Sequence, residues 1–169
     1  MADGTLKVGT ITNSAGSGNI AIGSGVTVNV NRPSFSAEGT GLTVANSTWT
    51  ELVGATENFD TDSVYSTSTG RFTVPTGQAG KYFFYYGSGI SGNPDDAEKV
   101  SVKLYKNGSQ VARSSVITYS SKDNNTTEVK GSYLLDLAEG DYVSVYMNHN
   151  EGASTSDAVV NFGGCKIGA

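Results

Sequence analysis

An unbroken run of five aromatic residues in the middle of the chain limits the possible folds more than any other stretch. The run is Tyr82, Phe83, Phe84, Tyr85 and Tyr86. Successive side chains of a strand point to opposite faces, so a strand here would be apolar on both faces. Such strands are covered on two sides. The sequence therefore predicts a β-strand that contacts a core on one face and a further packed surface on the other.

Other segments alternate apolar and polar residues with a period of two, which is typical of half-buried strands. No segment shows a convincing period of 3.6 residues. Asn107-Gly108 and Gly140-Asp141 are typical of tight turns, because Asn and Gly tolerate the positive φ that such turns require. The fold class expected is all-β, an antiparallel sandwich or barrel. Its later strands are expected at residues 71–74, 81–86, 99–105, 110–120, 126–137, 142–148 and 159–167.

The lengths of the connections indicate where a binding surface would lie. From residue 81 onward, long connections at 91–98, 121–125 and 149–157 alternate with the two tight turns. If successive strands run in opposite directions, the long connections share one end of the domain, opposite the carboxyl terminus. Exposed loops on a rigid scaffold are common binding surfaces. The residues expected to face outward there are Asn93, Asp95, Asp96, Asp123, Asn124, His149 and Glu151.

Residues 1–31 differ from the rest of the chain. They contain no aromatic residue, and short alternating sets such as Val26, Val28 and Val30 predict β-strands. These small apolar sets cannot bury enough surface alone, so partners are expected. Pro33 marks the boundary, because proline cannot join a central ladder. We therefore expect a β-stranded amino-terminal stalk or anchor at 1–31 and a second domain at 33–169.

Charge and composition argue against several classes of partner. The formal net charge is −5, and nucleic-acid binding needs a basic surface. No apolar run approaches the ~20 residues that span a bilayer, and no secretory signal is visible. Cys165 is the only cysteine, which excludes an internal disulfide, and we expect it to be a small buried apolar residue. Neither nucleic-acid binding nor membrane insertion is expected.

The residues that could carry chemistry form no convincing site. His149 is the only histidine, and a solvated loop histidine is the simplest interpretation. The pairs Asp60/Asp62 and Asp95/Asp96 lack the further oxygen ligands that calcium requires. We therefore expect no catalytic residue, no metal ligand, no cofactor and no enzymatic activity.

Several motifs of the second domain resemble those of the C1q-like domain in the C1q/TNF superfamily. The match spans residues 33–169, with departures at Ser66, where that family has Asp, and at Gly77-Gln78, which lengthens a turn. The matching positions are Asn58, Tyr65, Thr69-Gly70-Arg71-Phe72-Thr73-Val74-Pro75, Gly80-Lys81-Tyr82-Phe83-Phe84, Leu104-Tyr105-Lys106-Asn107-Gly108, Leu135-Asp136-Leu137, Gly140-Asp141-Tyr142-Val143 and Asn161-Phe162-Gly163-Gly164.

This resemblance implies a ten-stranded jelly roll that assembles as a homotrimer. The strand at residues 80–84 and the last strand would lie near the three-fold axis, which agrees with the two-sided aromatic run. Some C1q-like trimers hold calcium near that axis, so the resemblance leaves such a site open. The residues expected in the trimer core are Tyr82, Phe84, Tyr86 and Phe162.

The amino-terminal residues are similar to those of short virion proteins of tailed bacteriophages, and the segment Thr5–Thr12 carries this similarity. The resemblance implies a non-enzymatic virion protein, a trimeric knob held to a capsid or tail protein by residues 1–31. Its role would be surface decoration, fibre formation or adhesion to a host glycan or protein. Two alternatives stay open: a bacterial C1q-like adhesin or glycan-binding module, and a glycan depolymerase on a β scaffold.

Overall fold

The computed structural model describes residues 32–91, 98–120 and 126–168, which form twelve strands and no helix. Within these residues there is accordingly no helix long and apolar enough to cross a membrane. The strands are β1 (Ser34–Val44), β2 (Thr50–Glu51), β3 (Thr56–Thr61), β4 (Tyr65–Ser66), β5 (Arg71–Thr73), β6 (Gly80–Ser91), β7 (Lys99–Lys106), β8 (Ser109–Gln110), β9 (Val116–Tyr119), β10 (Thr126–Leu137), β11 (Tyr142–His149) and β12 (Thr155–Gly168).

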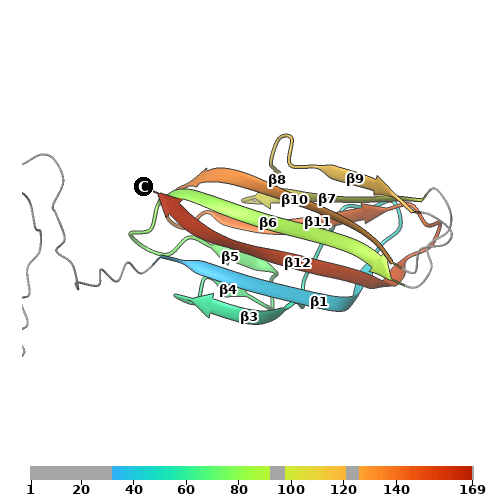
Figure 1. The fold of residues 1–169 in the computed structure, drawn as a ribbon, viewed down its shortest axis with the longest axis horizontal. Helices are drawn as coiled ribbons and strands as arrows, with labels where there is room; N and C mark the ends of the chain where they lie inside the picture. Colours follow the sequence, from blue (N-terminus) through green and yellow to red (C-terminus); the bar gives the residue numbers. More distant parts are fainter. Residues whose placement is uncertain (1–31, 92–97, 121–125, 169) are drawn as a thin grey trace, which may run out of the picture. The chain divides into compact units, whose positions relative to one another are not determined.

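The strands form two antiparallel sheets packed face to face (Figure 1). One sheet has the order β10-β6-β12-β1-β3. The other has the order β4-β5-β11-β7-β8, with β2 paired to β11 and β9 paired to β7. The all-β antiparallel sandwich expected from the period-two alternation is confirmed. The number of strands differs from ten because short pieces such as β2, β4 and β8 are only two residues long.

The core lies between the sheets and is filled by the inward positions of the alternating strands. Val100, Val102 and Leu104 of β7 are fully buried, as their alternation predicts. Aromatic rings fill the centre, where Phe35 stacks on Tyr65 with ring centroids 5.0 Å apart and Phe72 meets Phe84 edge-on at 5.2 Å. Such ring pairs add to the stability that burial alone provides.

One expected strand is interrupted. Residues 110–120 were expected to be continuous, but the structure breaks them between β8 and β9. The Ser114 hydroxyl donates to the carbonyl of Val111 at 2.9 Å and accepts from the amide of Leu104 at 3.1 Å. Arg113, beside it, has a φ of 61°. Serine hydroxyls offer the backbone an alternative to ladder bonds, which explains the break.

The two tight turns and the direction of the strands are as predicted. Asn107 and Gly108 have φ of 50° and 76°, and they join β7 to β8. The pairings Ser91 with Thr126 and Val100 with His149 bring the described ends of the three long connections to one end of the domain. We call this end the apex (Figure 1). β1 begins and β12 ends at the opposite end, which we call the base.

Candidate functional site

The outer face of the five-stranded sheet, which points away from the core, is the main candidate surface. The cross-strand register places its outward side chains in rows that run across the sheet. One row in the basal half is Leu134, Phe83, Cys165 and Ser34, from β10 to β1. Leu134 is 61% exposed and Phe83 is 36% exposed. Cys165, between Phe83 and Ser34, is only partly buried, so its expected full burial is wrong.

The second row is polar at its ends and aromatic at its centre. It consists of Ser132, Tyr85, Gly163 and Ser36. The ring of Tyr85 lies over Gly163, where an added Cβ would come within 2.2 Å of the ring. Its hydroxyl donates to Oγ of Ser36 at 2.8 Å, and the amide of Asn58 donates to the same oxygen at 3.4 Å. Tyr85 is therefore held flat against the sheet.

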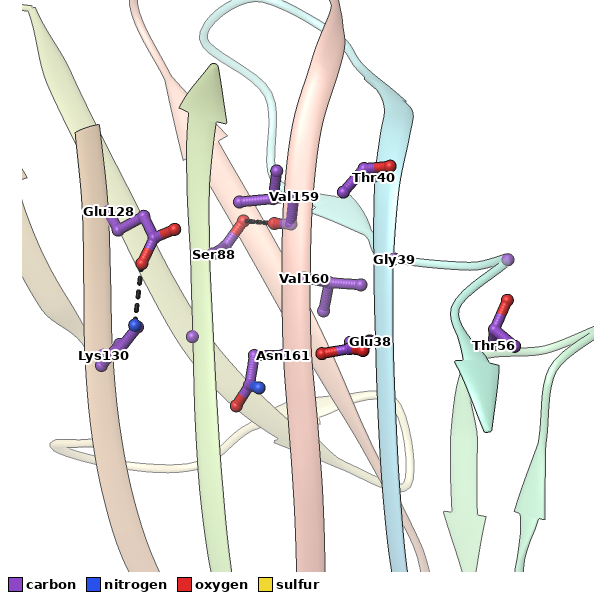
Figure 2. Close-up of a pocket in the computed structure, with 12 residues that line it drawn as sticks. Glu38, Gly39, Thr40, Thr56, Ser88, Glu128, Lys130, Val159, Val160 and Asn161 are labelled. Atoms are coloured by element: carbon purple, nitrogen blue, oxygen red, sulfur yellow. Dashed lines mark hydrogen bonds and ion pairs between the residues drawn. The ribbon is translucent and has the colours of Figure 1, made fainter. Parts of the chain in front are cut away.

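The third row carries opposite charges at its two ends. It consists of Lys130, Gly87, Asn161 and Glu38. A trough of about 610 Å³ lies over this row and continues towards the apex past Glu128 and Val159 (Figure 2). The ammonium group of Lys130 is 2.8 Å from the carboxylate of Glu128, its neighbour on β10.

Glycine forms the floor of this trough because β10 crowds the backbone of β6. A Cβ on Gly87 would lie 2.9 Å from Cγ of Lys130, and one on Gly89 would lie 2.4 Å from the carbonyl oxygen of Thr127. Both contacts are shorter than real Cβ atoms adopt. The glycines therefore leave the apical half of the outer face hollow, while Phe83 and Tyr85 fill the basal half.

The four residues expected in the trimer core lie inside a single protomer. Tyr82, Phe84, Tyr86 and Phe162 point inward and are at most 2% exposed without any partner. The side chains that β6 directs away from the core are instead those of Phe83 and Tyr85. Sequence reasoning also missed Leu134 and Lys130. Their signal was the position parity of β10, where even-numbered residues face outward.

The prediction that His149 is a solvated loop residue is wrong, because its side chain is 0% exposed at the end of β11. Nε2 lies 3.1 Å from the carbonyl oxygen of Val44, which can only accept, so Nε2 is the donor in this contact. Nδ1 accepts from the amide of Glu151 at 3.4 Å, and the Glu151 carboxylate lies 3.9 Å away. The ring thus ties β1 to β11 and has no exposed edge for substrate.

Of the other residues expected at the apex, only Glu151 is described, and it is partly buried. The remaining five residues lie outside the described part of the chain: Asn93, Asp95, Asp96, Asp123 and Asn124.

The carboxylate of Asp60, one of the acidic residues considered as a metal ligand, serves the domain's own backbone. Both carboxylate oxygens of Asp60 accept from backbone amides, those of Val64 at 3.0 Å and Tyr65 at 2.9 Å. Among residues 32–91, 98–120 and 126–168, no three His, Cys, Asp or Glu side chains are grouped as metal ligands would be. The carboxylate of Asp60 therefore stabilises the turn that leads to Val64 and Tyr65.

The outer face of the seven-stranded sheet is occupied by contacts within the chain. The ammonium group of Lys103 lies 3.7 Å from the ring centroid of Trp49, and Lys103 is only 5% exposed. The rings of Tyr105 and Tyr146 stack at 3.8 Å, and Arg71 forms a bidentate pair with Glu51. Burial raises the pKa of Glu51, but the hydrogen bonds from Arg71, Ser144 and Tyr146 and the charge of Arg71 together outweigh it and leave that pKa lowered. This face is therefore less available to a partner than the five-stranded one.

Residues 34–165, which include both sheets, match the protein family described as the C1q domain. The chain belongs to the C1q family. This C1q domain has the predicted C1q/TNF-like jelly-roll fold, with short extra strands beside the main ones. Among curated protein sequences, no match was found.

Solved structures similar to this C1q domain share its fold at low sequence identity. The globular domain of zebrafish complement 1qA protein is 21% identical, with a TM-score of 0.59 over 80% of this chain and 97% of that one. PRD1 vertex protein P5 is 17% identical, with a TM-score of 0.62 over 80% and 96%. Murine APRIL is 12% identical, with a TM-score of 0.52 over 81% and 100%. At these identities the likeness establishes the fold alone.

Proposed function

We propose that this C1q domain is a non-enzymatic structural knob of a virion that assembles as a homotrimer through the outer face of the five-stranded sheet. Residues 1–31 attach it to a capsid or tail protein, and the apex faces outward. Copies displayed together at the apex strengthen individually weak contacts with a host-surface glycan or protein.

The observation that carries the proposal is the apolar basal half of the outer face. Leu134 and Phe83 lie side by side in the register of β10 and β6, and both are exposed in the single chain. β10 is an edge strand twelve residues long, and such an edge is usually protected by pairing or covering. Packing against further copies would cover the apolar pair and this edge together.

The likeness to a PRD1 vertex protein supports the assignment to a virion. That structure has the highest TM-score of those compared above, although its identity is only 17%. The single histidine is buried and contacts Val44 and Glu151, so its ring offers no exposed edge to a substrate. A structural or binding role accounts for these observations with the fewest assumptions.

The oligomeric state tests the assembly surface directly. Sedimentation of the wild-type chain at micromolar concentration is expected to give a trimer, and Leu134→Asp is expected to give a monomer that still folds. Ile117→Asp is the matched control, because Ile117 on β9 is comparably exposed, at 53%, but belongs to the other sheet. A trimeric Leu134→Asp variant would contradict the proposed surface.

Whether the protein is part of a virion is tested on purified virus particles. Labelled antibody against the C1q domain is expected to decorate purified virions, and removal of residues 1–31 is expected to leave a trimer that no longer joins them. Incorporation of the truncated chain would contradict the anchor. Labelling of bacterial cells but not of virions would favour a bacterial adhesin.

A further inference from the structure

We propose that Lys130 of one copy pairs with Glu38 of a neighbouring copy, and that this pair sets the height at which adjacent copies meet. The inference rests on the proposed homotrimer and adds to it the residues that determine how its copies align.

Lys130 and Glu38 lie in the same row of the outer face, Lys130 on β10 and Glu38 three strands away on β1. Lys130 pairs with Gly87, Gly87 with Asn161, and Asn161 with Glu38, so both charges lie at one height along the strands. Three strand spacings separate them, roughly 14 Å, which is too far for direct contact within one chain. Both side chains line the trough, Lys130 from β10 and Glu38 from β1 (Figure 2).

If the copies are related by rotation about an axis parallel to the strands, equivalent residues of all copies lie at the same height along that axis. In such an arrangement, the β10 side of one copy approaches the β1 side of the next. Lys130 then meets Glu38 of the neighbour because both belong to the same row. The neighbour's β10 edge would also enter the glycine-floored trough, which this chain's own side chains leave empty.

The charges around the pair favour this contact. Lys130 is 69% exposed, and its partner within the chain, Glu128, is 43% exposed, so neither is enclosed. On the opposite side, Glu38 is exposed, and its neighbours in the trough are Thr40, Thr56 and Asn161, which are uncharged. Among the residues that line the trough, the one cation is Lys130, which lies three strands away from Glu38. A lysine arriving at Glu38 therefore meets a carboxylate with no lining cation beside it.

Charge exchange in the full chain tests the pair. Lys130→Glu and Glu38→Lys each place like charges opposite one another at every contact. Each is expected to raise the concentration of half-dissociation about tenfold, as loss of several exposed pairs predicts. The double variant K130E/E38K is expected to return it to within about threefold of wild type. The new acid at position 130 still faces Glu128 in the double variant, so recovery can come only from contact between copies.

Mixing the two single variants gives a second measurement. A mixed trimer has attractive charges at two of its three contacts, so mixing is expected to restore assembly in part. The control is the charge exchange R113E/E57R, at two exposed residues outside this row. It is expected to leave the concentration of half-dissociation unchanged. Thermal unfolding checks that every variant folds.

The possible outcomes distinguish failure of the proposed Lys130–Glu38 contact from failure of the proposed trimer. If the wild type is trimeric and the single variants associate equally well, or the double variant does not recover, the pair is wrong and the trimer stands. If the wild type is monomeric at the highest concentration reached, both proposals fall.

Discussion

Tyr85 donates a hydrogen bond to Ser36 at 2.8 Å and reaches it by lying across Gly163. The adjacent pair in the antiparallel register repeats this arrangement on the opposite face, where the ring of Phe84 lies over Gly164. Because Gly163 and Gly164 of β12 lack side chains, the rings of Tyr85 and Phe84 can pack against them, one on the outer face and one in the core.

We predict that these two glycines respond differently to alanine. A Cβ at Gly164 would lie 2.5 Å from the Phe84 ring and 2.7 Å from the carbonyl oxygen of Phe83, and neither can move freely. Gly164→Ala is therefore expected to lower the free energy of unfolding by about 3 kcal/mol. A Cβ at Gly163 meets only the far end of Tyr85, which can rotate away, so Gly163→Ala is expected to lose less than about 1 kcal/mol. Denaturant unfolding measures both, and equal losses would contradict the two-face arrangement.

Asp141 is predicted to make stability depend on acid. It accepts from Asn107 at 2.6 Å and from the amide of Ala138 at 2.8 Å, and Lys106 lies 2.7 Å away. Burial raises the pKa of Asp141, but these partners outweigh it and leave that pKa lowered. The stabilisation is therefore present above the unfolded pKa and is lost as pH falls through the folded one.

Asp141→Asn is the test of this acid dependence. It is expected to cost about 1–3 kcal/mol of unfolding free energy at neutral pH. It is expected to cost less at about pH 2, because the stabilisation is lost as pH falls from the ordinary aspartate pKa of ~3.9 through the lower folded pKa. Denaturant unfolding at both pH values measures the difference, and a cost that does not change with pH would contradict the role of the carboxylate.

Tyr65 and Tyr82 are predicted to make stability fall in alkali. Burial raises the pKa of each to about 12, with a smaller effect from Glu57 on Tyr65 and from Asp62 on Tyr82. The unfolded chain ionises first, so this stability is complete below about pH 10 and is lost as pH rises towards 12. Tyrosinate absorbance and unfolding, followed together, measure it. Tyr82→Phe is expected to reduce the dependence, and the exposed Tyr119→Phe is the control.

His149 is predicted to stabilise the folded domain. His149→Ala removes a fully buried ring and leaves the carbonyl of Val44 without its donor, so a loss of about 2–4 kcal/mol of unfolding free energy is expected. A reagent that acylates imidazole is expected to leave the folded chain unmodified and to modify it after unfolding. Rapid modification of the folded chain would contradict the burial of the ring.

The fold was predictable from the sequence because its signals are local. Alternation in β7 and β11 identifies which residues face the core, and Asn107-Gly108 specifies a tight turn. The two-sided aromatic run correctly indicated apolar residues on both faces of β6. It could not identify which set faces the core, because that depends on how β6 pairs with β10 and β12.

The candidate site was harder to predict because it depends on register between distant strands. Lys130, Gly87 and Glu38 form one row only after four strands, β10, β6, β12 and β1, align. The burial of His149 likewise depends on Val44, more than one hundred residues away. Sequence proximity to a long connection suggested exposure there, and the packing of β1 against β12 brings Val44 over it instead.

The base of the domain has a practical consequence for engineering. Arg32 donates to the carbonyl of Ile167 at 3.3 Å, so the polypeptide enters and leaves the jelly roll at one corner. A module with adjacent ends can be inserted into a surface loop of a host protein through two short linkers, without stretching either partner. The same adjacency would let a brief peptide join the two ends, so that new termini can be opened elsewhere in a circular permutant.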